Sequence, residues 1–208
     1  MDSAFLITTF VTLLVVIDPL ALTPMFIAIT QGIDKRRRRI IAVRACLTAA
    51  GILIIFGLLG EALLDFIGIS MSAFRIAGGI LLFLTALDML SDKRTQKRRE
   101  RSTEAGDDDH DDPSVFPLAI PLLAGPGAIT TVILLVAARP DWFGFAWVMG
   151  LMLAALTLVF ISFLSASFVE HALGKTGINV TTRLLGMLLA ALAVQFVLDG
   201  LRDFGFLA

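Results

Sequence analysis

Two proline-containing stretches of the chain carry the residue types that could form a binding site inside a membrane. The first runs from Asp18 to Pro24 and the second from Pro121 to Thr131. Each holds two prolines five residues apart, so the stretches superpose when the sequence is shifted by 102 residues. Proline lacks the N–H of a helical hydrogen bond and clashes with the preceding turn, which leaves backbone carbonyls without helical partners. Inside a bilayer such carbonyls must face protein, water or a ligand.

The second stretch has the backbone of an anion site. Gly125 and Gly127 flank Pro126 and remove side chains where a ligand could approach the main chain. A helix restarting near Ala128 would offer free N–H groups and the positive end of its dipole. These features favour the binding of a carboxylate.

The first stretch supplies a charge instead. Asp18 lies about fourteen residues into an apolar run, where a carboxylate costs ~2.5–3.5 kcal/mol on insertion scales. It could be compensated by a substrate ammonium, by a proton, by capping the helix that resumes after Pro19, or by pairing with a basic group such as Arg75. Hydroxyls that could bond a ligand or the freed carbonyls are those of Thr23, Thr130 and Thr131.

The composition is that of an integral membrane protein. Of 208 residues, 57% are hydrophobic and 17% charged, and the formal net charge of −1 gives no support for nucleic-acid binding. Each apolar run is long enough to cross the hydrocarbon as a helix of roughly 20 residues. Six spans are predicted, over residues 5–29, 41–65, 72–90, 115–138, 144–169 and 183–201.

The distribution of basic residues predicts an orientation. A cationic block from Lys35 to Arg39 follows the first span, and such loops stay in the cytoplasm. Alternating the sides from there makes loops 30–44, 91–114 and 170–183 cytoplasmic and places fourteen of the seventeen Lys and Arg on that side. Both termini are therefore predicted on the periplasmic side or its equivalent.

The chain divides into two halves that look duplicated. Residues 1–90 form one predicted three-span repeat, 91–114 a charged linker and 115–208 a second repeat, together making one membrane domain. Arg75 to Gly78 and Arg183 to Gly186 have similar sequences at an offset of 108 residues. An odd number of spans per half predicts an all-α fold of two inverted repeats, as in secondary transporters. The first and fourth spans are predicted to be broken, or re-entrant, at their proline motifs.

The sequence gives little support for metal binding or for common enzyme chemistry. The acidic residues between Glu104 and Asp112 lack the spacing of a preorganised metal cage, so a solvated linker is favoured and no metal site is predicted. The sequence has no phosphate loop of the Walker type, no His-Glu-x-x-His and no Gly-x-Ser-x-Gly. We therefore expect neither an enzyme nor a cofactor.

The motifs resemble those of the MarC family, which includes the SnatA-type exporters of small neutral amino acids. The resemblance covers the chain outside residues 91–113 and is most specific between Phe116 and Thr131. It implies six spans, a bacterial inner membrane, and transport of amino acids such as glycine, alanine, serine or threonine.

The residues and the resemblance together suggest a zwitterion site. The backbone of Gly125, Gly127 and Ala128 is assigned to the substrate carboxylate, and Asp18 with carbonyls near Leu20, Ala21, Leu22 and Thr23 to its ammonium. Thr130 or Thr131 would add supporting bonds, Pro19, Pro24, Pro121 and Pro126 would break the helices, and Arg75 and Gln195 are further polar candidates.

Several alternatives stay open at this point. A passive channel or facilitator is the nearest rival, and a metal-ion carrier or a non-transporting scaffold is less favoured. The sequence also leaves open the exact substrate, the direction of transport, the coupling proton or other ion, and the oligomeric state.

Overall fold

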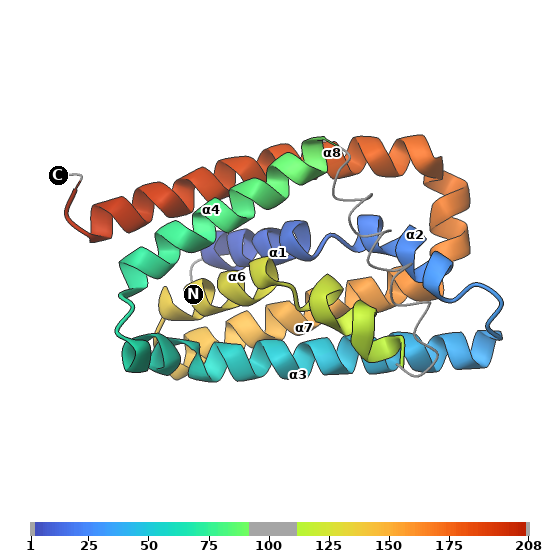
Figure 1. Ribbon diagram of the computed structural model, residues 1–208, viewed down its shortest axis with the longest axis horizontal. Coiled ribbons are helices and arrows are strands. Elements are labelled where there is room, and N and C mark those ends of the chain that lie inside the picture. Colours follow the sequence, from blue (N-terminus) through green and yellow to red (C-terminus); the bar gives the residue numbers. More distant parts are fainter. Residues whose placement is uncertain (1–2, 92–111, 207–208) are drawn as a thin grey trace.

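The structure of this chain, a computed structural model, is built from helices and describes residues 3–91 and 112–206 (Figure 1). No strand occurs among these residues. The linker predicted at 91–114 falls mostly outside the described ranges, as does the acidic run from Glu104 to Asp111. The elements are α1 (Ser3–Ile17), α2 (Pro19–Ile29), α3 (Lys35–Ile67), α4 (Met71–Leu90), η1 (Ser114–Leu123), α6 (Pro126–Ala137), α7 (Trp142–Leu164) and α8 (Ala166–Asp203).

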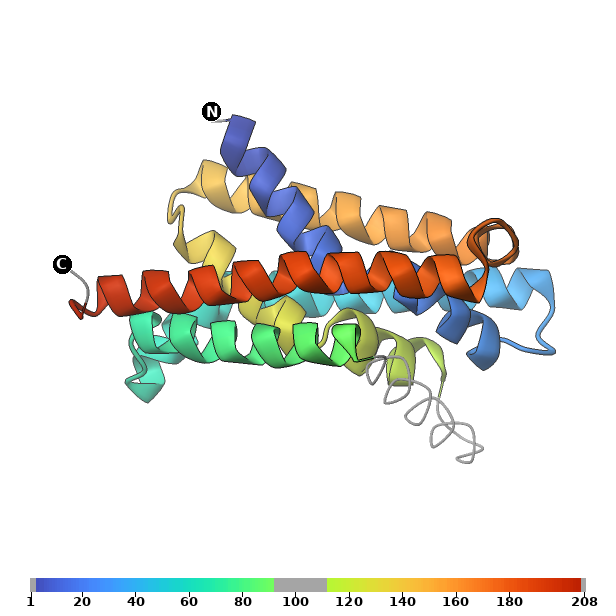
Figure 2. The ribbon, with the colours of Figure 1, turned by 90° about the horizontal axis from the view of Figure 1, so that it is seen from above.

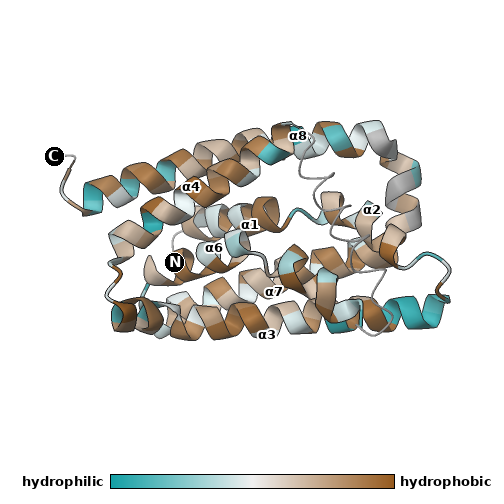
Figure 3. Ribbon diagram, viewed as in Figure 1, coloured by the Kyte–Doolittle hydropathy of each residue, from teal (hydrophilic) through white to brown (hydrophobic). Residues whose placement is uncertain are grey.

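The elements form an elongated bundle with its helices along the long axis (Figure 1). Both chain ends lie at one end of the bundle, and α3 begins at the opposite end, where hydrophilic residues gather (Figures 1 and 3). This second end, which carries Lys35–Arg39, is called the basic end below. In the described part of the chain, five segments are long and apolar enough to cross a membrane, counting α1 with α2 as one, and there are six if the bent pair η1 and α6 is also one span.

Two predicted loops are shorter than expected or replaced by helix: residues 30–34 do connect α2 to α3, but 35–44 and 170–183 are helical, so these boundaries were wrong. Residues 30–44 contain the first turns of α3, because the Asp34 side chain accepts hydrogen bonds from the N–H groups of Arg36 and Arg37 and caps the helix there. Residues 170–183 belong to α8, which is interrupted only at Gly174, where φ is 59°. Polar composition marks the edge of a bilayer, but it does not end a helix.

The bundle contains an antiparallel pair, α4 and α8, which lie side by side (Figures 1 and 2). Small residues recur every seven positions on both helices and meet in three layers. A Cβ at Gly79 would lie 2.8 Å from the Ala193 carbonyl oxygen, and one at Gly200 would lie 3.0 Å from that of Ser72. The third layer brings Gly186 within 3.4 Å of the Ala86 oxygen by the same measure. Such small residues let membrane helices approach closely.

Large apolar side chains are exposed on the outer faces of the bundle. Leu47 and Leu58 on α3 are 67% and 54% exposed, and Leu184 on α8 is 57% exposed. Scattered apolar residues occur on any protein surface, but outward-facing rows on several long helices match a hydrocarbon solvent. The helix length and this surface together indicate membrane spans.

Candidate functional site

The first helix break lies at Asp18, between α1 and α2. Asp18 adopts a left-handed conformation with φ 56° and ψ 71°, and Pro19 occupies the first position of α2. The Asp18 Oδ1 atom accepts a hydrogen bond from the Ala21 N–H at 3.3 Å, and the residue is fully buried. Aspartate tolerates this conformation better than most residues because its short side chain bonds locally. The structure therefore shows the capping role considered for Asp18, with a carboxylate held inside the bundle.

The second break lies between η1 and α6, whose axes are bent by 56°. Pro126 occupies the first position of α6, and Gly125 precedes it in an extended conformation with no side-chain cap for the helix. Within η1, Phe116 and Ile120 have extended backbones because each precedes a proline, which disfavours the helical conformation. The N-terminus of α6 thus carries N–H groups that no side chain caps.

The equivalence expected between the proline motifs is wrong. At a shift of 102, Pro19 would correspond to Pro121, but Pro121 lies inside η1, before the break. The structure instead places Pro126 where Pro19 lies, at the first position of the resumed helix. The offset becomes 107 residues and aligns Asp18-Pro19-Leu20-Ala21-Leu22-Thr23 with Gly125-Pro126-Gly127-Ala128-Ile129-Thr130. Five-residue spacing alone could not distinguish a proline that starts a helix from one that lies within it.

The two breaks are neighbours in space. A Cβ added at Gly127 would lie 3.6 Å from Cγ1 of Val16 and 3.2 Å from Cδ2 of Leu82. Val16 is in the last turn of α1, and α1 contacts α6 directly. The end of α1 and the start of α6 therefore meet, and Asp18 follows Val16 by two residues in the chain.

Thr130 and the glycines account for the tight packing around this crossing. A Cβ at Gly78 on α4 would lie 2.2 Å from the Thr130 methyl group, and one at Gly125 would lie 2.5 Å from the Pro121 oxygen. Thr23 donates its hydroxyl hydrogen to the Pro19 carbonyl at 2.9 Å. This is a bond to the carbonyl four residues earlier in the same helix, so the ligand role expected for Thr23 stays a prediction.

A pocket of about 420 Å³ lies beside the second break. Its lining comes from α3, α4, η1 and the start of α6, and Thr130 has the only polar side chain among the described lining residues. Leu63 and Ile120 at its rim are 46% and 43% exposed, so the pocket reaches the outer surface of the bundle. It is lined by Phe56, Gly60, Leu63, Leu64, Phe74, Ile120, Pro121, Ala124, Pro126, Ile129, Thr130 and Ile133.

Comparison with known proteins decides the family. The family model for MarC integral membrane proteins matches residues 3–204. A UPF0056 membrane protein of Methanocaldococcus jannaschii is 37% identical over 97% of this chain and 98% of its own. The chain belongs to the MarC family. The UPF0056 inner membrane protein YhgN of Escherichia coli is 34% identical, with 95% of this chain and 96% of the relative aligned. YvbG of Bacillus subtilis is likewise 34% identical, with coverages of 96% and 95%. No solved structure matches the chain.

Not every predicted site residue of this MarC-family protein lies at the breaks. Arg75, near the start of α4, forms an ion pair with Asp203 in the last turn of α8. Gln195 is exposed on α8 and donates a hydrogen bond to Asp199 at 2.8 Å. Arg75 therefore does not compensate Asp18, and neither side chain lines the described pocket.

The structure adds buried hydroxyls that the sequence argument did not select. Thr9 and Thr12 on α1 are 1% and 2% exposed, and helical spacing places them on one face with Val16. The hydroxyl of Thr131, which the sequence did select, is also buried and has no hydrogen-bond partner within the described residues. The three-residue spacing of Thr9 and Thr12 was the sequence feature from which this buried polar face could have been predicted. In the described ranges no three His, Cys, Asp or Glu side chains gather as a metal site would require.

Proposed function

We propose that this MarC-family protein is a secondary transporter that moves small neutral amino acids, such as glycine, alanine, serine and threonine, across the inner membrane. The observation that carries the proposal is the meeting of two interrupted helices inside the bundle. One brings a buried carboxylate, Asp18, and the other brings the uncapped start of α6. A zwitterion presents the complementary charges, an ammonium and a carboxylate.

The same observation supports an inverted repeat. The segment α1–α2 and the segment η1–α6 run in opposite directions along the bundle (Figure 1). At the offset of 107, the capping residues Asp34 of α3 and Asp141 of α7 also correspond. The related offset of 108 for Arg75 and Arg183 supports a single duplication. Transporters of this kind bind substrate at the interface of the repeats and rock the halves around it.

Recognition would divide between the two halves. The N–H groups at Gly127 and Ala128, with the dipole of α6, would hold the substrate carboxylate. Asp18 and the carbonyls between Leu20 and Thr23 would hold its ammonium, with Thr130 and Thr131 adding hydroxyls. Of the residues assigned here to the substrate, only Thr130 lines the pocket of about 420 Å³, so the zwitterion site would lie beside that pocket, at the breaks themselves.

The decisive experiment is counterflow in proteoliposomes. Vesicles preloaded with unlabelled glycine, alanine, leucine or arginine are given labelled alanine outside. We expect transient accumulation with glycine and alanine and none with arginine. Asp18→Asn keeps an oxygen for the Ala21 N–H and tolerates the left-handed conformation, so it removes the charge alone. It should slow counterflow about tenfold or more, which is the effect expected when a hydrogen bond to a charged group is lost.

A second variant tests the opposite half. Gly127→Val places a branched side chain against Leu82 and Val16 and should abolish counterflow. Gly150→Val on α7 is the matched control, because a Cβ there has no neighbour within 4 Å. Folding is checked by size-exclusion chromatography. Absence of counterflow by folded wild-type protein contradicts the proposal, and flux without saturation or counterflow identifies a passive channel instead.

A further inference from the structure

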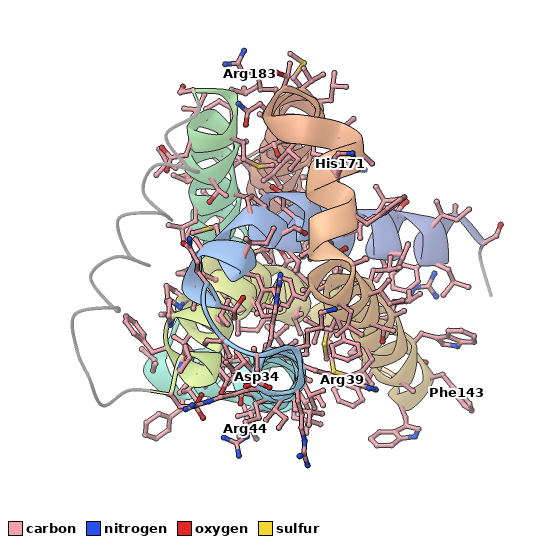
Figure 4. All side chains as sticks on the ribbon, turned by 90° about the vertical axis from the view of Figure 1, so that its right-hand side faces the viewer. Asp34, Arg39, Arg44, Phe143, His171 and Arg183 are labelled. Carbon is pink, nitrogen blue, oxygen red and sulfur yellow. The ribbon has the colours of Figure 1, made fainter. Side chains whose placement is uncertain are left out.

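One arginine at the basic end of the bundle differs from its neighbours. Arg37 and Arg39 are exposed, whereas Arg38 is half-buried. Figure 4 looks onto this end and shows Asp34, Arg39 and Arg44 around the start of α3. The central guanidinium carbon of Arg38 lies 5.1 Å from the centre of the Phe26 ring on α2, within cation–π range.

The Phe26 ring is itself fixed. It stacks on the Phe163 ring of α7 with their centres 4.2 Å apart and their planes 5° from parallel. Both phenylalanines are 1% exposed. Arg38 therefore rests on a buried aromatic pair that joins α2 to α7, and its guanidinium group is held in one orientation.

The guanidinium group presents an unused edge. Its Nε and Nη2 atoms are both buried, and neither donates a hydrogen bond to any acceptor in the described part of the chain. These two nitrogens carry the parallel N–H groups that fit the two oxygens of one carboxylate. A buried donor without a partner costs roughly 1–3 kcal/mol, and more when it is charged. The edge is therefore prepared for an anion.

We propose that the Nε–Nη2 edge of Arg38 binds the carboxylate of the transported amino acid near the basic end of its path. This occupant rests on the proposed transport function, whereas the anion site rests on Arg38 alone. Phe26 comes seven residues after Pro19 on α2, roughly 10 Å along the helix from the first break. Arg38 of α3 thus lies over α2, the element that leads from the first break to the basic end.

Two features favour a small carboxylate over a lipid phosphate at this position. The Nε and Nη2 atoms are buried beside the aromatic pair, so a small carboxylate would reach them more easily than a phosphate with attached acyl chains. Arg38 also lies in the first turn of α3, where the helix dipole favours an anion. Asp34 already accepts hydrogen bonds from the N–H groups of Arg36 and Arg37. The hydrogen bonds to the anion must therefore come from the Arg38 side chain.

The test compares wild type with Arg38→Lys, which keeps the charge and loses the paired edge. The matched control is Arg39→Lys at the exposed neighbour. Purified full-length protein in detergent is heated in sodium acetate or in sodium chloride of equal ionic strength. Acetate should raise the Tm of wild type and Arg39→Lys but not of Arg38→Lys. In counterflow, Arg38→Lys should raise the KM for alanine about tenfold. Arg38→Gln is a second variant and should also lose the acetate response.

Each outcome decides between the two proposals. Equal acetate responses and equal KM values in the two lysine variants would overturn the anion site. An acetate response that requires Arg38, in a wild-type protein that moves no amino acid, would keep the anion site and reject the transport function. Stabilisation by phosphatidylglycerol but not by acetate, again through Arg38, would identify a lipid phosphate and contradict the substrate assignment.

Discussion

Asp18 shows how one residue can combine a structural and a proposed functional role. Its backbone turns the chain with φ 56°, its side chain caps α2, and its charge is buried among apolar helices. Asparagine could perform the first two tasks. Only the charge, which a bilayer makes costly, distinguishes aspartate here. Comparing the wild-type protein with the Asp18→Asn variant therefore isolates the effect of the negative charge, which is the property that an ammonium ligand needs.

Asp112 offers a pH-dependent test at the same scale. Hydrogen bonds from the Ser114 hydroxyl and N–H, with the Arg44 guanidinium 2.9 Å away, hold the pKa of the Asp112 carboxyl below its ordinary value. A lowered folded pKa means that the stabilisation is present above the ordinary pKa and is lost as the pH falls through the folded value. Because both partners are largely exposed, it is worth at most about 1 kcal/mol.

Asp112→Asn should therefore lower the Tm slightly at pH 7, and its Tm should converge with that of wild type in strong acid. Scanning fluorimetry across this pH range measures both effects. Arg44→Gln removes only the ion pair and should lower the Tm by less than Asp112→Asn, because the Ser114 hydrogen bonds lower the pKa of Asp112 more than Arg44 does. A Tm difference between Asp112→Asn and wild type that grows as the pH falls would contradict the assigned sign.

At the scale of elements, the pair of α4 and α8 depends on small residues at matching positions. Ser72, Gly79 and Ala86 face Gly200, Ala193 and Gly186 in antiparallel order. Because backbone oxygens as well as side chains form the opposing surface, a larger side chain at these positions would push the two helices apart. The seven-residue repeat of small residues can be recognised in the sequence. The helix against which it packs cannot.

Gly79→Leu should consequently separate α4 from α8. A Cβ at Gly79 already lies 2.8 Å from a backbone oxygen, so we expect a destabilisation of about 1–3 kcal/mol or more. Gly51→Leu on α3 is the control, because nothing lies within 4 Å of a Cβ there. Thermal unfolding in detergent should show a lower Tm for Gly79→Leu only. Equal Tm values for Gly79→Leu and Gly51→Leu would show that the protein tolerates the separation of α4 from α8.

At the scale of the molecule, the basic end and the end that holds both termini are opposite (Figure 1). If the basic end lies on the cytoplasmic side of the membrane, both termini face the periplasm. Single cysteines at Arg37 and Phe206, in a Cys46→Ser background, test this orientation with an impermeant maleimide. In spheroplasts we expect labelling of Phe206→Cys, and labelling of Arg37→Cys only after permeabilisation. The reverse pattern would invert the proposed topology.

Much of the fold could be predicted because membrane insertion depends on local composition. Apolar length gave the spans, and the prolines pointed to both regions where a helix is interrupted. The boundaries of α3 and α8 could not be obtained in this way, because a helix continues through polar residues wherever capping permits. The shift of 102 failed for a related reason: a proline has the same local chemistry at the start of a helix as within it.

The sequence alone determined that this is an integral membrane protein with a proline-interrupted segment in each half, because apolar runs and missing N–H groups act locally. Only the tertiary structure decided which residues meet. It placed Val16 beside Gly127, paired Arg75 with Asp203, exposed Gln195 and set Arg38 over Phe26. These relations join segments distant in the chain, and they depend on helix direction and close packing, which no single stretch of sequence encodes.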